Sequence, residues 1–223
     1  MSTSPSRRFK DEVFEQFARI GKAVSSPKRL ELLDILCQGP RTVEVLADQA
    51  SLSLANASQH LQVLRAARLI EAEKSGLFVT YRIADGVEGF YLGLRHLAEA
   101  RLAEIEATTR AYLEQRGAME SVDSAELLRR ALSGEVTVLD VRSVEEYRAG
   151  HLPKAHSVPL AQLRSRLGEF AKDRVVVAYC RGPYCVLAVE AVQMLRDEGF
   201  CALRLESGPP DWRAGGIVLE AGP

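Results

Sequence analysis

The sequence has few of the features that mark membrane, secreted or fibrous proteins. Its apolar runs are no longer than a strand, so none can cross a bilayer and we expect no membrane partner. Four cysteines scattered over 223 residues are too few for a disulfide framework, which indicates reduced thiols and a cytoplasmic protein. Residues 1–8 are polar with no apolar segment behind them, so we expect no signal peptide. Internal repeats and low-complexity tracts are also missing.

Acidic residues are missing from one stretch of an otherwise balanced chain. The formal net charge of −1 argues against binding nucleic acid over the whole surface. Between Gln49 and Ile70, however, there is no Asp or Glu, while His60, Arg65 and Arg68 lie inside this window. A surface that faces phosphates needs such a window, although a partly buried helix can also lack acids by chance.

Hydrophobic periodicity divides the chain into two parts. It predicts helices over 9–24, 28–37, 43–50 and 54–67, two strands over 70–73 and 78–83 joined by a hairpin, and a long helix over 86–116. The periodicity stops at residues 117–121, which we interpret as a linker. The length suits two domains of about a hundred residues each, and we place them at 1–117 and 118–223.

Two short helices joined by a tight turn and followed by a two-stranded ribbon make a winged helix-turn-helix. The run from Leu52 to Ile70, with the core Ser58-Gln59-His60-Leu61-Gln62-Val63-Leu64-Arg65, closely resembles the recognition segment of the ArsR/SmtB family of bacterial repressors, and the resemblance extends over about residues 9–116. It implies a mainly α-helical domain with a β-hairpin wing. It also implies a homodimer, held by the first and last helices of the domain, that represses by binding a palindromic operator.

The fourth predicted helix carries polar side chains on the face opposite its leucines. Asn and Gln can bridge the two major-groove groups of adenine, and Ser can donate to a base or a phosphate. The alternative is an ordinary solvated face. Lys74 and Arg82 on the wing suit phosphate contacts, and His60 can equally be a half-buried structural residue. The predicted DNA contacts are Ser53, Asn56, Ser58, Gln59, His60, Gln62, Lys74 and Arg82.

The sequence departs from the metal-sensing patterns of the ArsR/SmtB family. The third predicted helix has no cysteine pair, and the last one offers only His96 and Glu99, without a second histidine. Cys37 has no cysteine partner in the first domain, and we expect it to be a small buried residue. We therefore predict neither a metal site nor a cofactor.

The second half contains a hexapeptide, residues 180–185, that we call the cysteine loop: Cys180-Arg181-Gly182-Pro183-Tyr184-Cys185. It follows an apolar run, residues 175–179, and precedes a helical pattern that begins at Val186. Backbone N–H groups and a helix N-terminus both favour a thiolate, and Arg181 adds positive charge. Cys180 is therefore the candidate nucleophile.

Three further motifs accompany the cysteine loop in a fixed order: Asp140-Val141-Arg142, Glu146-Tyr147 with Gly150-His151, and Ser207-Gly208-Pro209-Pro210-Asp211-Trp212. With the loop they resemble a rhodanese domain over about residues 119–223. The resemblance implies an α/β domain with a parallel sheet. It also implies a persulfide on Cys180 that takes sulfane sulfur from a donor and passes it to a thiol acceptor or cyanide.

Several roles within this domain stay open from the sequence. Val186 stands where a Cys-x5-Arg phosphatase or arsenate reductase has its arginine, so we exclude that chemistry. Cys185 can form a disulfide with Cys180, attack its persulfide, bind a soft metalloid such as As(III), or simply fill space. Arg181 can meet an anionic donor or be a solvated arginine. Asp140 and Arg142 are predicted to hold the loop by an ion pair, and Cys201 to lie in the core.

The sequence thus predicts two domains, a winged helix-turn-helix and an α/β rhodanese-like domain. The favoured function is a repressor that senses or transfers reactive sulfur at Cys180 and Cys185. The alternatives are a sulfurtransferase that its DNA-binding domain localises or regulates, and a repressor that responds to As(III) through the same thiols.

Overall fold

The computed structural model describes residues 4–76, 78–116 and 124–222, and these form two compact units, residues 1–91 and 92–223. The division falls inside one helix, α5 (Val87–Arg101). The predicted linker, residues 117–121, lies outside the described residues, and the domain boundary at 117/118 therefore stays a prediction.

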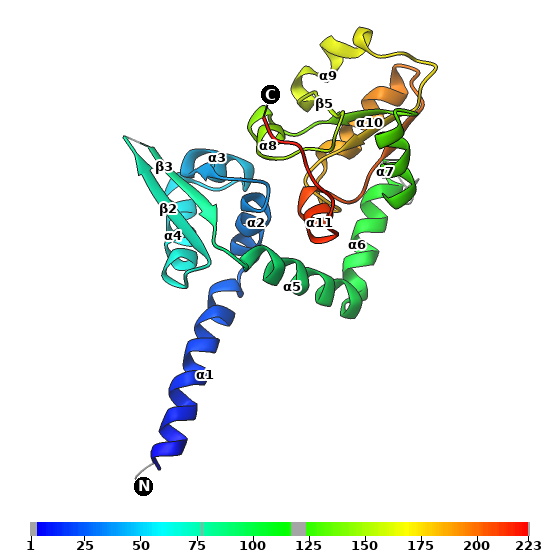
Figure 1. Ribbon diagram of the computed structural model, residues 1–223. Coiled ribbons are helices and arrows are strands. Elements are labelled where there is room, and N and C mark those ends of the chain that lie inside the picture. The colour runs from blue at the N-terminus through cyan, green and yellow to red at the C-terminus, as the bar shows by residue number, and fades with distance from the viewer. Residues whose placement is uncertain (1–3, 77, 117–123, 223) are drawn as a thin grey trace. The chain divides into compact units, whose positions relative to one another are not determined.

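The first unit is a winged helix-turn-helix (Figure 1). Its three strands form an antiparallel sheet in the order β1-β3-β2. The two-residue strand β1 was not predicted, because it is too short to show an alternating pattern. Its elements before α5 are α1 (Pro5–Val24), α2 (Pro27–Leu36), β1 (Arg41–Thr42), α3 (Val43–Gln49), α4 (Leu54–Ala66), β2 (Ile70–Ser75) and β3 (Phe78–Ile83).

The core of this unit forms where α2, α3 and α4 turn their leucines inward. Leu33, Leu46, Leu61 and Leu64 are fully buried, and each belongs to the apolar side of its helix. Ser53 caps α4: its hydroxyl accepts a hydrogen bond from the backbone N–H of Asn56 at 3.3 Å. The predicted recognition helix is therefore fixed in place by its leucines and by a cap at its first turn.

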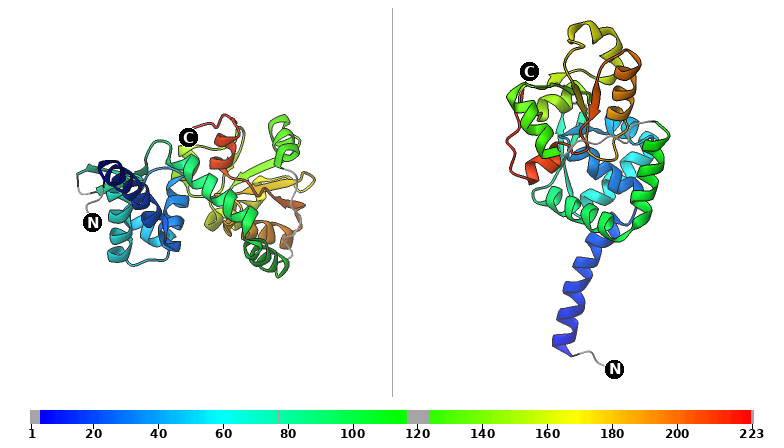
Figure 2. Two further views of the ribbon diagram at one scale, coloured as in Figure 1. Left: turned by 90° about the horizontal axis from the view of Figure 1, so that it is seen from below. Right: turned by 90° about the vertical axis from the view of Figure 1, so that its right-hand side faces the viewer.

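Helix α1 differs from the other helices of the first unit, because it projects from them as a single long rod (Figures 1 and 2). Its side chains Phe9, Phe14 and Phe17 are each 65% exposed. An apolar stripe on a helix is normally buried against a partner.

The predicted long helix over 86–116 is wrong at one point. It is two helices, α5 and α6 (Ala103–Glu114), separated at Leu102, whose backbone is extended with φ −116° and ψ 94°. No glycine or proline marks this break. Leu113 of α6 is buried against Val189, so packing, rather than local sequence preference, holds α6 in its separate direction.

The second unit contains a parallel four-stranded sheet in the order β5-β4-β6-β7, as the rhodanese resemblance implied. Its elements after α6 are α7 (Ser124–Ser133), β4 (Thr137–Asp140), α8 (Val144–Ala149), β5 (His156–Ser157), α9 (Leu160–Arg166), a 3-10 turn (Leu167–Glu169), β6 (Val176–Tyr179), α10 (Leu187–Asp197), β7 (Ala202–Arg204) and α11 (Pro209–Ala214).

The central strand β6 is buried on both faces, and its side chains alternate between two cores. Val177 and Tyr179 pack with Trp212 on one face. Val176, Ala178 and the following Cys180 pack on the other, with residues of α10. Because parallel strands end at the same edge of a sheet, the residues that follow β4, β6 and β7 meet there. The candidate active site lies at this edge.

Candidate functional site

The cysteine loop is tightly enclosed. Cys180 is only 2% exposed. A side chain at Gly208 would overlap the carbonyl oxygen of Arg181, so only glycine allows the segment before α11 to approach the loop this closely. Gly182 has φ +154°, at the margin of the region that favours glycine. The loop is thus held by backbone contact as well as by side chains.

Cys180 and Cys185 are thiols that lie within hydrogen-bonding reach of each other. The Cys180 S–H also donates to the backbone carbonyl of Cys185 at 3.3 Å. Burial raises the pKa of the Cys180 thiol well above its ordinary value. The backbone N–H groups of Ala188 and Gly182 lower the same pKa, but by a smaller amount. Burial thus opposes the thiolate that the loop is expected to favour at Cys180, and this expectation stays a prediction.

Cys185 carries the activated sulfur of the pair. The hydrogen bond from Cys180, the N–H groups of Arg181 and Leu187, and the Arg181 charge lower the pKa of Cys185 to about 7 against the opposing effect of burial. In this pair the thiolate therefore forms more readily on Cys185 than on Cys180. Transfer of the Cys180 proton to Cys185 converts Cys180 into the nucleophile that the sequence predicts.

Arg181 forms an ion pair and is therefore not a freely solvated arginine. Its Nε and Nη2 donate to the two carboxylate oxygens of Glu146 at 2.6 and 3.1 Å. Glu146 is fully buried, and it also accepts from the N–H of Ser143, which completes a capping box at the start of α8. Sequence reasoning missed this partner. The Ser143-x-x-Glu146 spacing predicts the cap, but not the second role of the carboxylate.

Asp140 and Arg142 form a second buried ion pair, as predicted, but at a different place. Arg142 Nη2 lies 2.6 Å from Asp140 Oδ2, and both side chains are at most 1% exposed. The same nitrogen donates to the carbonyl oxygen of Gly150 at 2.7 Å. The pair therefore ties the end of β4 to the turn at Gly150. Next to that turn the ring of His151 stacks on Tyr147, which fits a structural role.

The other two cysteines belong to different parts of the chain. Cys37 is buried in the first unit, as predicted. Cys201 is exposed, so its assignment to the core is wrong. It precedes the first residue of β7 and only its backbone carbonyl joins the sheet, by accepting from Val176. Apolar neighbours in the sequence suggested a longer strand than the structure has.

The predicted DNA-facing residues lie together on α4 and its cap, with the wing alongside in the same unit. Asn56, Gln59 and Gln62 are exposed, as is Ser53, while Ser58 and His60 are half-buried. On the wing, Lys74 is exposed and Arg82 forms an ion pair with Glu71. Both partners of this pair are 51% exposed, so it contributes little stability and leaves Arg82 able to exchange Glu71 for a phosphate.

His96 and Glu99, the weak metal candidates, are engaged by other groups. His96 lies against Arg95, while Glu99 forms an ion pair with Arg95 and accepts a hydrogen bond from Tyr184. Among the described residues no group of three or more His, Cys, Asp or Glu side chains could hold a metal ion. The same residues include no helix long and apolar enough to cross a membrane.

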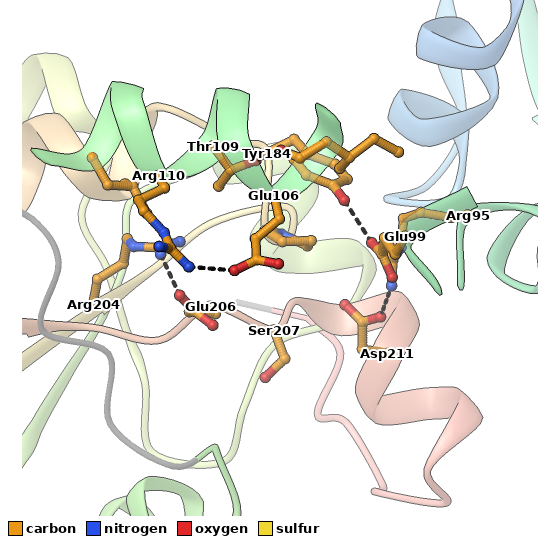
Figure 3. A pocket seen from close by; sticks show the side chains of 13 residues that line it. Arg95, Glu99, Glu106, Thr109, Arg110, Tyr184, Arg204, Glu206, Ser207 and Asp211 are labelled. Carbon is orange, nitrogen blue, oxygen red and sulfur yellow. Dashed lines mark hydrogen bonds and ion pairs between the residues drawn. The ribbon is translucent and has the colours of Figure 1, made fainter. Parts of the chain in front are cut away.

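Glu99 belongs to a network that we call the α5 clasp: Arg95, Glu99, Tyr184 and Asp211. The Tyr184 hydroxyl donates to Glu99 at 2.7 Å, Arg95 lies 3.3 Å from Glu99, and Arg95 also pairs with Asp211 (Figure 3). Asp211 in turn accepts from the N–H of Gly208 at 3.0 Å. The clasp joins α5 to the cysteine loop and to α11, and sequence reasoning did not foresee it.

Two family models match the chain, each over one of the two units. The bacterial regulatory protein arsR family matches residues 26–72, and the rhodanese-like domain matches residues 123–214. The matched regions contain the exposed polar face of α4 and the cysteine loop, respectively.

Among known proteins, the chain is 42% identical over 215 residues to the HTH-type transcriptional regulator Rv0324 of Mycobacterium tuberculosis, covering 96% of this chain and 94% of its relative. The chain therefore belongs to the arsR-type HTH regulator family and carries a rhodanese-like domain behind its winged helix.

Two other proteins match one half each. A sulfurtransferase of Allochromatium vinosum is 30% identical over 105 residues, 46% of this chain and 96% of that protein. The homodimeric winged helix-turn-helix DNA-binding domain (fragment 1–100) of Mb0332 from Mycobacterium bovis, a possible ArsR-family regulator, is 35% identical with a TM-score of 0.42, and covers 46% of this chain and 94% of that chain.

The thiol pair generates a prediction on pH dependence. Because thiolate reacts and thiol does not, alkylation of Cys185 by iodoacetamide should rise with pH through a midpoint of about 7, while Cys180 resists. In Cys180→Ala, loss of the hydrogen bond should move the Cys185 midpoint upward, toward the ordinary thiol value. Site-resolved mass spectrometry measures both. Equal midpoints in wild type and variant would contradict the shared proton.

Proposed function

We propose that this protein is a cytoplasmic transcriptional repressor that binds a palindromic operator as a homodimer, and that sulfur carried at Cys180 and Cys185 weakens its hold on DNA. The observation that supports this most is the path of α5. Near its start, the Tyr91 hydroxyl donates to Asp34 of α2 at 3.0 Å, within the DNA-binding unit. Near its end, Arg95 and Glu99 form the α5 clasp with the cysteine loop and α11.

The DNA-binding part of the proposal rests on α4. Its exposed face offers Asn56, Gln59 and Gln62, whose amides match the donor and acceptor pattern of adenine in the major groove. The acid-free window around them leaves phosphates unopposed. Arg82 and Lys74 on the wing add phosphate contacts that carry affinity rather than specificity.

The homodimer is supported by apolar side chains that the single chain leaves uncovered. Phe9, Phe14 and Phe17 line α1, and Phe90 and Leu97 of α5 are 42% and 58% exposed. A second copy that covers these faces buries them and pairs two recognition helices, which a two-fold symmetric operator requires.

The DNA face can be tested by substitution. Asn56→Ala with Gln59→Ala should abolish specific operator binding in a protein that remains a folded dimer, since each bidentate base contact is worth about 1–3 kcal/mol of discrimination. Fluorescence anisotropy with operator and scrambled duplexes measures it. Unchanged preference for the operator would show that α4 is not the recognition helix.

Two further variants help to interpret this result, one as a neutral control and one that should disrupt the dimer. Gln193→Ala, on an exposed position of α10, should leave operator binding unchanged. Phe14→Ser with Phe17→Ser should instead shift the protein toward monomer in analytical ultracentrifugation and weaken binding to the palindrome more than binding to a half-site.

The chemistry proposed for the cysteine loop is sulfur transfer. The Cys180 thiolate attacks the sulfane sulfur of a donor such as thiosulfate, the sulfur–sulfur bond breaks, and sulfite leaves with its electron pair. The persulfide anion then faces the N–H groups of Gly182 and Ala188. Either an external thiolate takes the outer sulfur, or Cys185 attacks Cys180 itself, releasing hydrosulfide and leaving a Cys180–Cys185 disulfide.

The transfer reaction has a direct assay. Purified protein should move sulfur from thiosulfate to cyanide or a thiol, at least slowly, and Cys180→Ser should remove the activity because a hydroxyl cannot form a persulfide. Cys185→Ser should slow transfer to cyanide without abolishing it, since the variant lacks the thiolate that takes the Cys180 proton but keeps the sulfur that carries the persulfide. Full activity in Cys180→Ser would refute the assignment of the nucleophile.

The coupling of the two parts has a separate test. Polysulfide should weaken operator binding by about tenfold, which corresponds to about 1.4 kcal/mol of coupling. The response should vanish in Cys180→Ser and change in Cys185→Ser. Tyr184→Phe, which removes the hydroxyl that donates to Glu99, should reduce the response while sulfur transfer to cyanide persists.

Two outcomes would contradict the coupling. A fragment of residues 1–117 that responds fully to polysulfide would place the sensor at Cys37. Sulfur transfer without any change in DNA binding would favour the alternative of a sulfurtransferase localised by its DNA-binding domain.

A further inference from the structure

A pocket of about 640 Å³ lies beside the cysteine loop, wholly within the unit of residues 92–223 (Figure 3). One wall comes from α5 and α6, another from Pro183 and Tyr184 of the loop, and a third from the segment that follows β7. Its volume falls in the range that holds a small organic ligand. The sulfur chemistry proposed above does not use it, since neither Cys180 nor Cys185 lines it.

Arg204 gives this pocket a group that a ligand can satisfy. Its side chain is only 3% exposed, and its Nη2 donates to Glu206 at 2.6 Å. Its buried Nε–H has no hydrogen-bond partner within the described part of the chain. A buried arginine donor is rarely left unpaired. A carboxylate suits the position, because carboxylates accept from the planar edge of a guanidinium.

The remaining charges of the pocket are mixed. Three arginines and four carboxylates line it: Arg95, Arg110, Arg204, Glu99, Glu106, Glu206 and Asp211. Figure 3 shows Arg110, Arg204 and Glu206 at one end, Arg95, Glu99 and Asp211 at the other, and Glu106 between. The surplus of carboxylates disfavours a phosphate or another simple anion. The arginines likewise disfavour a simple cation.

One ion pair of the pocket is free to exchange partners. Arg110 and Glu106 pair on α6 with side chains 57% and 72% exposed, so their attraction is weak. A ligand with both charges can replace it: a ligand carboxylate meets Arg110 and Arg204, and a ligand ammonium meets Glu106. Ile105, Leu113 and Pro183 supply apolar surface between them.

We propose that this pocket binds a small zwitterion, an amino acid or short peptide with an apolar side chain, as a second input to the regulator. The proposal goes beyond the sulfur chemistry and does not depend on it. The occupant touches α6, α5 and the cysteine loop together, and therefore lies beside the α5 clasp that we propose carries the sulfur signal. Binding should accordingly alter operator affinity in the thiol form of the protein.

The test uses leucyl-leucine and two blocked forms of it on the full chain. Isothermal titration calorimetry should show saturable binding of the free dipeptide. The C-terminal amide and the N-acetyl form should each bind at least about tenfold more weakly. Arg110→Gln and Arg204→Lys should each weaken the free dipeptide by about tenfold, and Glu106→Gln should do the same. Glu114→Gln, on an exposed position of α6 outside the pocket, is the matched control and should bind as wild type.

Failure of this inference is distinguishable from failure of the proposed function. Cys180→Ser should bind the dipeptide with unchanged affinity, whatever happens to sulfur transfer. Absence of binding at millimolar dipeptide would overturn the proposal, as would equal binding of the free and blocked forms or binding insensitive to the exposed variant Arg110→Gln.

Discussion

The bidentate ion pair between Arg181 and Glu146 is the contact on which the cysteine loop depends. Glu146 is fully buried, so its charge is tolerated only because Arg181 and the N–H of Ser143 compensate it. Removing one partner of such a pair typically costs about 3–5 kcal/mol. The pair fixes the residue next to Cys180 to the start of α8, and the close approach of Gly208 fixes the other side of the same residue. Both contacts restrain the cysteine loop at Arg181.

A restrained loop suits a sensor, because a displacement of one sulfur atom must also displace the residues that contact it. Cys180 is packed with residues of β6 and α10, so an added sulfur atom changes the contacts of a buried side chain. Tyr184, in the same loop, is 47% exposed and bonds to Glu99 of α5. We therefore expect a displacement of the cysteine loop to move Tyr184, and Tyr184 to shift α5 through its bond to Glu99. Helix α5 continues into the unit that contains α4.

Local patterns in the sequence predicted the helices, strands and turns, because these depend on residues that are close along the chain. The leucine spacing of α4, the turn before it and the wing gave the winged helix-turn-helix, and the apolar run of β6 with its motifs gave the parallel sheet. Contacts between distant residues were not predictable. The break at Leu102, the partner of Arg181 and the α5 clasp each depend on side chains more than 30 positions away or on packing without a local signal. The burial of Cys180 was likewise not predictable, because a pattern of residues does not reveal how deeply a sulfur lies.

In the function that we propose, sulfur at Cys180 loosens the hold of the cysteine loop on α5. Amide hydrogen exchange of residues 95–101 in the full chain tests it most directly, by comparing the reduced protein with the Cys180 persulfide. We predict that persulfide formation accelerates exchange in these residues as operator affinity falls, and that Tyr184→Phe accelerates it without sulfur. Unchanged protection of residues 95–101 in a persulfide form that has lost operator affinity would contradict the account.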